Sequence, residues 1–208
     1  METACDIVVR AGSDRVWELV TDIELSIRFS PELQRVTWLG GATGPKLGAR
    51  FEGHNRSDAV GEWRTESHVV AFEPPKTFAW AVVDPDGRFG DTETDPAKPM
   101  ATWRFDLTPH EDGVLLRQGV RLGPARSGLS KFIDAMPDKR DAIIAYRLAD
   151  LRTSMEATLR GIKELAESRG ALVTPAKRLG PVPHPSGPVH TDREAGSLLR
   201  ALRDEENH

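Results

Sequence analysis

The stretch that decides the fold lies near the end of the chain, at residues 144–162, and reads IAYRLADLRTSMEATLRGI. Its large apolar residues recur at intervals of four, three, four, four and three, and they are Ile144, Leu148, Leu151, Met155, Leu159 and Ile162. Such intervals place side chains on one face of an α-helix. Because the 32 residues between Pro137 and Gly170 contain no proline, the pattern predicts one amphipathic helix. A rise of about 1.5 Å per residue makes it about 40 Å long.

The part of the chain before this helix has the texture of extended segments broken by turns. A short β-type run at 5–10 is followed by two short helical pieces that end before Pro31. Six further strands are predicted at 35–40, 48–56, 61–72, 77–83, 101–108 and 114–122. Short Gly-, Pro- and Asp-rich turns join most of them, which is typical of an antiparallel meander. We therefore predict an α+β protein with a seven-stranded antiparallel sheet.

Alternation along the strands separates two faces of this sheet. The face that we predict to be inside carries large rings and a few uncharged polar groups, namely Phe51, Asn55, Trp63, Thr65, Ser67, Phe78, Trp80, Trp103, Phe105 and Gln118. It carries no Asp, Glu, Lys, Arg or His. The other face is charged, and we expect His54 and His68 to lie on it in contact with solvent.

Two interpretations of the inner face are open. Rings at alternate positions pack any half-buried sheet, so the set could be core alone. Its polar members favour a pocket, because a buried polar group costs about 1–3 kcal/mol when it lacks a partner. Met155 and Thr158 of the long helix complete the predicted ligand-binding set. On that helix, Arg147 flanks the apolar face, and we expect Tyr146 to point away from it.

Five pieces of the chain resemble the START/Bet v 1-like (SRPBCC) superfamily, in its polyketide cyclase/dehydrase and lipid-transport branch. They are DRVWELVTDIE (14–24), LGARFEGHNR (47–56), WRTESHVVAFEPPKTFAWAV (63–82), ATWRFDLTPHEDGVLLRQ (101–118) and LRTSMEATLRGIKELAE (151–167). The resemblance covers about residues 3–168. It implies the helix-grip fold, a curved seven-stranded sheet wrapped around a long C-terminal helix, with two short helices after the first strand and an internal cavity for a hydrophobic molecule.

The resemblance leaves three functions open, because a fold hosts many functions. The first is binding of a small hydrophobic molecule that is aromatic, polyketide-like or a lipid. The second is a polyketide aromatase/cyclase that folds a poly-ketone chain delivered by an acyl carrier protein. Its candidate catalytic residues are Arg147, Asn55 and Gln118, which could polarise carbonyl groups. The third is a chaperone-associated interaction protein.

The composition excludes several other classes. Lys and Arg number 28 against 32 Asp and Glu, a net charge of −4 with the signs interleaved, so we expect no nucleic-acid partner. The one cysteine, Cys5, excludes an intrachain disulfide, and neither His54 nor His68 has the spacing of a metal site. We predict no metal and no cofactor. The chain shows no apolar run of 18 residues and no signal-peptide pattern, so we expect a cytoplasmic protein, as a monomer or a homodimer.

Prolines mark the C-terminal end of the predicted domain. Five of the 15 prolines lie between Pro175 and Pro188. We therefore predict a ligand-binding domain at 1–170 and a Pro/Gly-rich tail at 171–208 with a possible short helix at 192–204. Within the domain, the acidic loop 84–95 is predicted at the mouth of the pocket. Met136-Pro137 should separate a short helix at 128–135 from the long one.

Overall fold

A computed structural model describes residues 1–58 and 60–168, so the predicted tail at 171–208 and its helix at 192–204 lie outside the described residues. In the described part, seven strands form one antiparallel sheet in the order β1-β7-β6-β5-β4-β3-β2. Their bounds are β1 (Glu2–Val9), β2 (Leu33–Trp38), β3 (Arg50–Ser57), β4 (Gly61–Glu73), β5 (Thr77–Val83), β6 (Ala101–His110) and β7 (Gly113–Leu122). Strands that follow one another from β2 to β7 are neighbours in the sheet, as expected for a meander.

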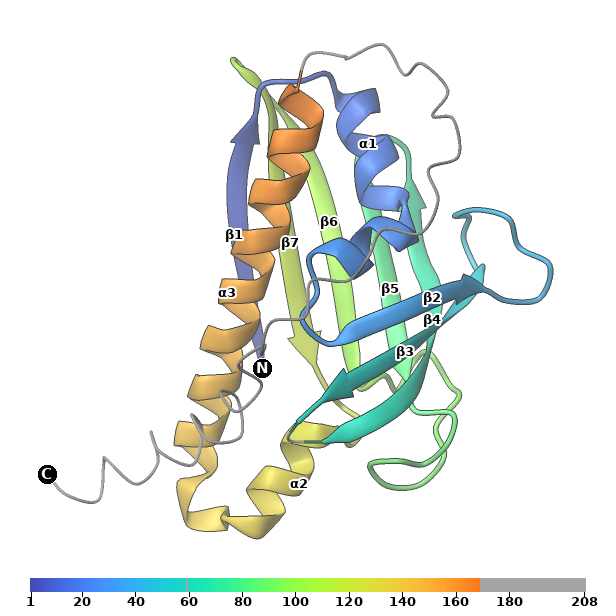
Figure 1. The fold of residues 1–208 in the computed structure, drawn as a ribbon, viewed down its shortest axis with the longest axis vertical. Coiled ribbons are helices and arrows are strands. Elements are labelled where there is room, and N and C mark those ends of the chain that lie inside the picture. Colours follow the sequence, from blue (N-terminus) through green and yellow to red (C-terminus); the bar gives the residue numbers. More distant parts are fainter. Residues whose placement is uncertain (59, 169–208) are drawn as a thin grey trace, which may run out of the picture.

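The helices lie at two places in the chain. Between β1 and β2 come α1 (Ser13–Thr21) and the 3-10 helix η1 (Ile23–Arg28). After β7 come α2 (Gly128–Ala135), the 3-10 turn η2 (Pro137–Lys139) and the long α3 (Arg140–Glu167). Figure 1 shows α3 running beside β1 and β7, with α1 in front of the sheet and α2 at the opposite end of α3. The predicted α+β helix-grip fold is confirmed, including the two short helices after the first strand.

The sheet curves strongly, and β2, β3 and β4 turn towards the viewer in Figure 1. Register shifts between Leu33 and Arg35 and between Val69 and Ala71 interrupt the pairing of β2 and of β4, and such bulges increase bend and twist. Gly53 of β3 allows the side chains of Leu33 in β2 and Thr65 in β4 to lie close to its backbone. A Cβ at this position would lie 3.0 Å from both Leu33 Cδ1 and Thr65 Oγ1.

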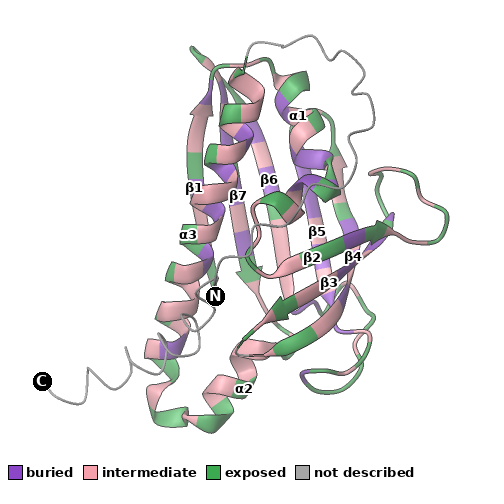
Figure 2. Cartoon of the chain, viewed as in Figure 1, coloured by how far each residue is buried: buried purple, intermediate pink, exposed green. Residues whose placement is uncertain are grey.

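The core lies between the inner face of the sheet and the buried stripe of α3 (Figure 2). The stripe consists of Leu151, Met155, Leu159 and Ile162, as the apolar spacing predicts, and all are at most 6% exposed. They form one cluster with inward residues of the strands and with α1. No helix of the described ranges is long and apolar enough to cross a membrane.

The first turns of α3 differ from the prediction. Ile143, rather than Ile144, is the buried residue there, at 1% exposure. Tyr146, expected to point away, packs against Ile143, and so does Phe132 of α2. The physical reason is that α2 packs against the first turns of α3, whereas the sheet packs against its later turns. The two neighbours therefore bury different sides of the helix. Helical periodicity identifies a face, but it does not identify which neighbour covers that face.

Candidate ligand-binding cavity

A cavity of about 350 Å³ lies between the sheet and α3. Its walls come from the inner face of β3 to β7, from α3, from the segment that joins η1 to β2, and from α2. This volume falls within the range of roughly 300–1,000 Å³ that is usual for small-molecule sites. The same elements that build the core therefore leave a space large enough for a compact organic molecule.

One wall of the cavity is made of aromatic rings centred on Trp80. Trp80 of β5 and Trp103 of β6 are direct partners in the sheet, and their rings stack at 6.4 Å between centroids with 14° between planes. Phe78, Phe105 and Phe51 surround Trp80 at centroid distances of 5.2, 6.0 and 6.3 Å. The rings of β5 and β6 come together because inward residues at paired positions lie side by side, and Phe51 reaches Trp80 from β3 across β4. The result is a broad apolar surface suited to a flat molecule.

The structure brings every predicted site residue to this cavity. The residues that line it include Phe51, Asn55, Trp63, Thr65, Ser67, Phe78, Trp80, Trp103, Phe105, Gln118, Met155 and Thr158, together with the candidate catalytic residue Arg147. Tyr146, which the helical pattern places elsewhere, also lines it. Contact with a ligand stays a prediction for each of them.

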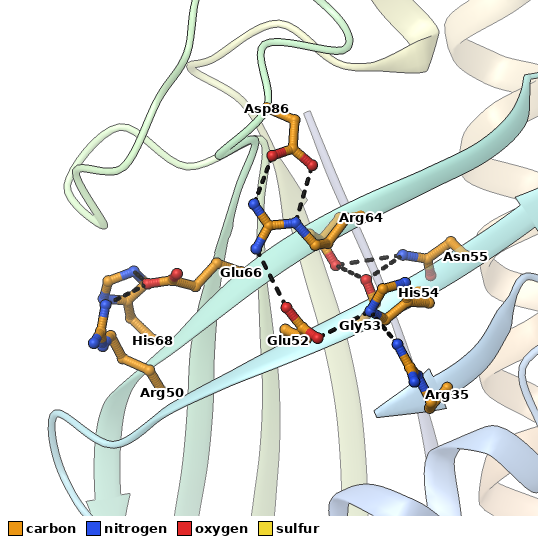
Figure 3. A network of polar contacts seen from close by, with 11 residues as sticks. Arg35, Arg50, Glu52, Gly53, His54, Asn55, Arg64, Glu66, His68 and Asp86 are labelled. Carbon is orange, nitrogen blue, oxygen red and sulfur yellow. Dashed lines mark hydrogen bonds and ion pairs between the residues drawn. The ribbon is translucent and has the colours of Figure 1, made fainter. Parts of the chain in front are cut away.

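Asn55 and Thr65 form a small polar cluster on the β3–β4 side of the cavity. Asn55 Nδ2 donates to Gly53 O at 3.4 Å and to Thr65 Oγ1 at 3.3 Å, while Thr65 Oγ1 donates to Gly53 O at 3.4 Å. Figure 3 shows Asn55 and Gly53 side by side on these strands. The donor groups of both side chains are thus already directed to acceptors of the protein.

Gln118 lies on the other side of the cavity, on β7, paired with Cys5 of β1 and Phe105 of β6. Its side chain is 6% exposed, and its Oε1 is buried without a hydrogen-bond partner among the described residues. An unpaired buried acceptor costs about 1–3 kcal/mol. This amide therefore marks a point where a bound molecule gains a hydrogen bond that the protein itself does not supply.

A cluster of three charged side chains joins the cavity wall where α3 meets the segment before β2. Arg147 Nη1 and Nη2 each donate to a carboxylate oxygen of Glu32 at 3.3 Å, and Nη1 donates to Asp150 Oδ2 at 2.6 Å. Burial alone would lower the pKa of Arg147, but the two carboxylates outweigh it and hold the pKa above its ordinary value. The guanidinium is therefore charged, and both of its Nη atoms donate to carboxylates.

The two carboxylates of this cluster were missed by reasoning from the sequence. The inner face of the strands carries no charge, as predicted, yet Glu32 and Asp150 line the cavity from outside the strands. Asp150 follows Arg147 by three positions on the helix, a spacing that could have indicated the pair. Glu32 gives no such signal, because it lies 115 positions from Arg147 and meets it through the fold alone.

The predicted loop at the pocket mouth contributes one ring to the wall. Phe89 is 5% exposed, lines the cavity, and meets Trp63 edge-on at 6.2 Å between centroids. Its backbone N–H donates to Asp84 Oδ2 at 2.8 Å, and Lys131 Nζ of α2 lies 5.5 Å from the ring centroid. These contacts join the loop to α2 at one end of the cavity.

The two histidines lie on the outer face of the sheet in a charged network (Figure 3). His54 Nε2 lies 2.9 Å from Glu52 Oε1, and the hydrogen bond from His54 is the main reason why the pKa of Glu52 is lowered. Arg64 donates to Glu52 at 3.2 Å and to Asp86, and it lowers the pKa of Asp86. This network stabilises the outer face and has no contact with the cavity.

The expectation that His68 is solvated is wrong. Its side chain is only 16% exposed, and its Nε2 lies 3.0 Å from Glu66 Oε1 without the geometry of a hydrogen bond. Arg50 Nη1, which donates to the same Glu66 oxygen at 3.0 Å, helps to crowd this site. Alternation assigned His68 to the correct face, but the long side chains around it cover it.

This fold and this cavity define a helix-grip protein with an internal cavity between the sheet and α3. The sequence profile of the family described as polyketide cyclase/dehydrase and lipid transport matches residues 3–167, and the chain belongs to this family. The match agrees with the resemblance found in the sequence and spans nearly all of the described residues. The comparison with curated proteins found no match for the chain.

Solved structures give the same fold. A polyketide-cyclase-like protein from Corynebacterium glutamicum is 28% identical, with 79% of this chain and 90% of that chain covered and a TM-score of 0.52. The di-domain ARO/CYC BexL of the BE-7585A biosynthetic pathway is 19% identical, covering 82% of this chain and 51% of BexL at a TM-score of 0.56. Ara h 8.0201 is 13% identical, with 81% of this chain and 99% of that chain covered and a TM-score of 0.51. The chain thus spans about half of the di-domain protein.

Proposed function

We propose that this protein binds a small, mainly apolar molecule with a ring system in the cavity between the sheet and α3. The observation that carries the proposal is the cavity of about 350 Å³ with a wall of five rings, Trp80 and the four rings around it. Stacking on such rings contributes about 0.5–1.5 kcal/mol per ring pair beyond the burial of apolar area. Membership in a family of cyclases and lipid carriers supports the same function.

Two neighbouring positions of α3 provide a matched test. Ser154 lines the cavity, whereas Thr153 is exposed on the same helix. We expect Ser154→Phe to fill the cavity and Thr153→Phe to leave it open. Small molecules that co-purify with the protein are identified by mass spectrometry after solvent extraction, and affinity for flat polycyclic and fatty compounds is measured by calorimetry.

The expected result is a bound molecule in the wild type and in Thr153→Phe, and at least a tenfold loss of affinity in Ser154→Phe. A wild-type protein that carries no molecule and binds none of the compounds would contradict the proposal. Equal affinity in the two variants would contradict it as well, since the cavity would then have no part in binding.

A second candidate is a polyketide aromatase/cyclase, and it is favoured by the family description, which names cyclases first. In this case an acyl carrier protein would deliver the poly-ketone chain to the cavity. Replacing Asn55, Gln118 or Arg147 by Ala should then change the ratio of cyclised products in a reconstituted synthase while the fold survives. Unchanged products from all three variants would exclude this function.

A further inference from the structure

The polar groups that line the cavity differ in how many of their hydrogen-bond donors remain free. Thr158 Oγ1 donates to Ser154 O at 3.0 Å, one turn back on α3. Asn55 donates to Gly53 O and Thr65 Oγ1, and Arg147 donates to two carboxylates. A hydroxyl whose proton is engaged still accepts, and so does the amide oxygen of an Asn whose nitrogen donates. Thr158 and Asn55 therefore offer a ligand mainly acceptors, while most N–H groups of Arg147 are already engaged with carboxylates.

The charge of the cavity wall also disfavours a ligand that carries a negative charge. Glu32 and Asp150 carry one negative charge each and Arg147 one positive charge, so the cluster in the cavity wall has a net charge of −1. A ligand carboxylate placed here would meet two carboxylates and a guanidinium whose two Nη atoms already donate to them. Removing it from water would then be poorly compensated. A neutral ligand avoids this cost.

Gln118 provides the position where a polar group of the ligand is recognised. Its Oε1 is buried without a partner in the described part of the chain, and its neighbour in the sheet is Phe105, whose ring lies 6.0 Å from Trp80. A ring resting on the aromatic wall can thus direct a substituent towards this amide. A hydroxyl group can donate its proton to this unpaired Oε1, which an ether or a hydrocarbon cannot do.

Resting on the proposed function, we infer that the ligand is a neutral ring compound with a hydroxyl group that hydrogen-bonds to Gln118. Gln118 is then a specificity-determining residue, and the protein discriminates against hydrocarbons, which leave the amide unpaired, and against carboxylates. A free fatty acid is accordingly a poor ligand. The inference concerns only which ligands are preferred, whereas the proposed function concerns whether the cavity binds ring compounds at all.

The test compares four probes of one ring system by calorimetry at pH 7, namely 2-naphthol, naphthalene, 2-methoxynaphthalene and 2-naphthoate. We expect the wild type to bind 2-naphthol about tenfold more tightly than naphthalene, in line with one hydrogen bond to a buried group that is otherwise unpaired. The methoxy compound, which cannot donate, should bind like naphthalene. The carboxylate should bind most weakly of the four.

The residue assignment is tested with Gln118→Met, which keeps a similar volume and removes the amide. We expect its preference for 2-naphthol over naphthalene to fall to less than threefold, with naphthalene binding retained. The same substitution at the exposed Gln34 is the control and should keep the wild-type preference. Thermal unfolding checks that both variants fold, and the comparison of probes on the wild type does not depend on either variant.

Each outcome decides a separate question. If none of the four probes binds and no other ring compound does, the proposed function fails. If naphthalene binds but 2-naphthol is no tighter, or if 2-naphthoate binds as tightly as 2-naphthol, the inference about the ligand class is wrong and the proposed function stands. If the preference is present but survives in Gln118→Met, the hydroxyl is recognised elsewhere and the assignment to Gln118 is overturned.

Discussion

Gly161 in the second half of α3 is where a single methyl group should have the clearest effect on this fold. The ring of Phe29, which lines the cavity, packs against the helix at this position. A Cβ built on Gly161 would lie 2.1 Å from Phe29 Cε1 and 2.4 Å from Cζ. Carbon atoms in favourable contact are about 3.5–4.0 Å apart. Gly161→Ala therefore requires the ring to move by more than about 1 Å.

Two opposing contributions set the size of the effect. Replacing Gly by Ala inside a helix stabilises it by about 0.8–1.0 kcal/mol. Forcing an extra methyl into a packed site costs about 1–3 kcal/mol. We therefore expect Gly161→Ala to lower the free energy of unfolding by about 1 kcal/mol, which corresponds to a drop in Tm of about 2–4 °C for a domain of this size. The displaced ring should also narrow the cavity and weaken ligand binding.

The assay is urea unfolding of Gly161→Ala in two backgrounds, the wild type and Phe29→Ala. Without the ring, the clash is absent, so the same substitution should become stabilising by up to about 1 kcal/mol. Gly128→Ala in α2 is the control, because its Cβ would meet Phe89 and Val60 at an ordinary 3.6 Å. If Gly161→Ala stabilises the wild type, or changes both backgrounds equally, the packing argument is refuted.

Two further predictions concern charged groups. Arg147→Ala should lower the free energy of unfolding, measured in urea, by about 1–2 kcal/mol, which lies between the effects of removing exposed and buried ion pairs. Arg147→Lys should recover only part of this loss, because an ammonium group cannot pair with Glu32 through two parallel hydrogen bonds. Burial would raise the pKa of Asp106, yet hydrogen bonds from Arg104 and Thr77 outweigh it and the pKa is lowered. A lowered folded-state pKa stabilises the protein above the ordinary value of 3.8, and this contribution is lost as the pH falls through the folded value. Asp106→Asn should therefore lose less stability than the wild type between pH 5 and pH 3, and an equal loss in both proteins would contradict the assignment.

The features that the sequence predicts well are those that follow from local periodicity. A strand alternates its side chains with a period of two, so alternation alone places Trp80 and Trp103 on one face of the sheet. The apolar spacing in α3 likewise identifies Met155 as inward. The end of α2 at 135 was predictable because Pro137 separates this helix from the long one.

The features that could not be predicted depend on distant contacts. Tyr146 is turned to the cavity because α2 docks on the first turns of α3, and a helical wheel carries no information about that neighbour. Glu32 meets Arg147 only because the segment after η1 crosses the helix. Whether a polar residue such as Gln118 is paired or left without a partner also follows from atomic positions, not from its place in a strand.

The hydrogen bonds of the cavity also bear on the choice between holding a molecule and cyclising it. Cyclisation passes through an oxyanion, which needs preorganised donors. Asn55 and Thr158 give their donors to the protein, and Arg147 gives its own to two carboxylates. If Arg147 turned to a substrate oxyanion, it would leave Glu32 unpaired beside the developing negative charge, which opposes the same transition state. Gln118 is a further polar group of the cavity wall, and one neutral amide can hold an oxygen but cannot also remove the proton that enolisation requires. The hydrogen bonds of Asn55, Thr158 and Arg147 therefore support the proposal that the cavity binds a molecule and does not cyclise it.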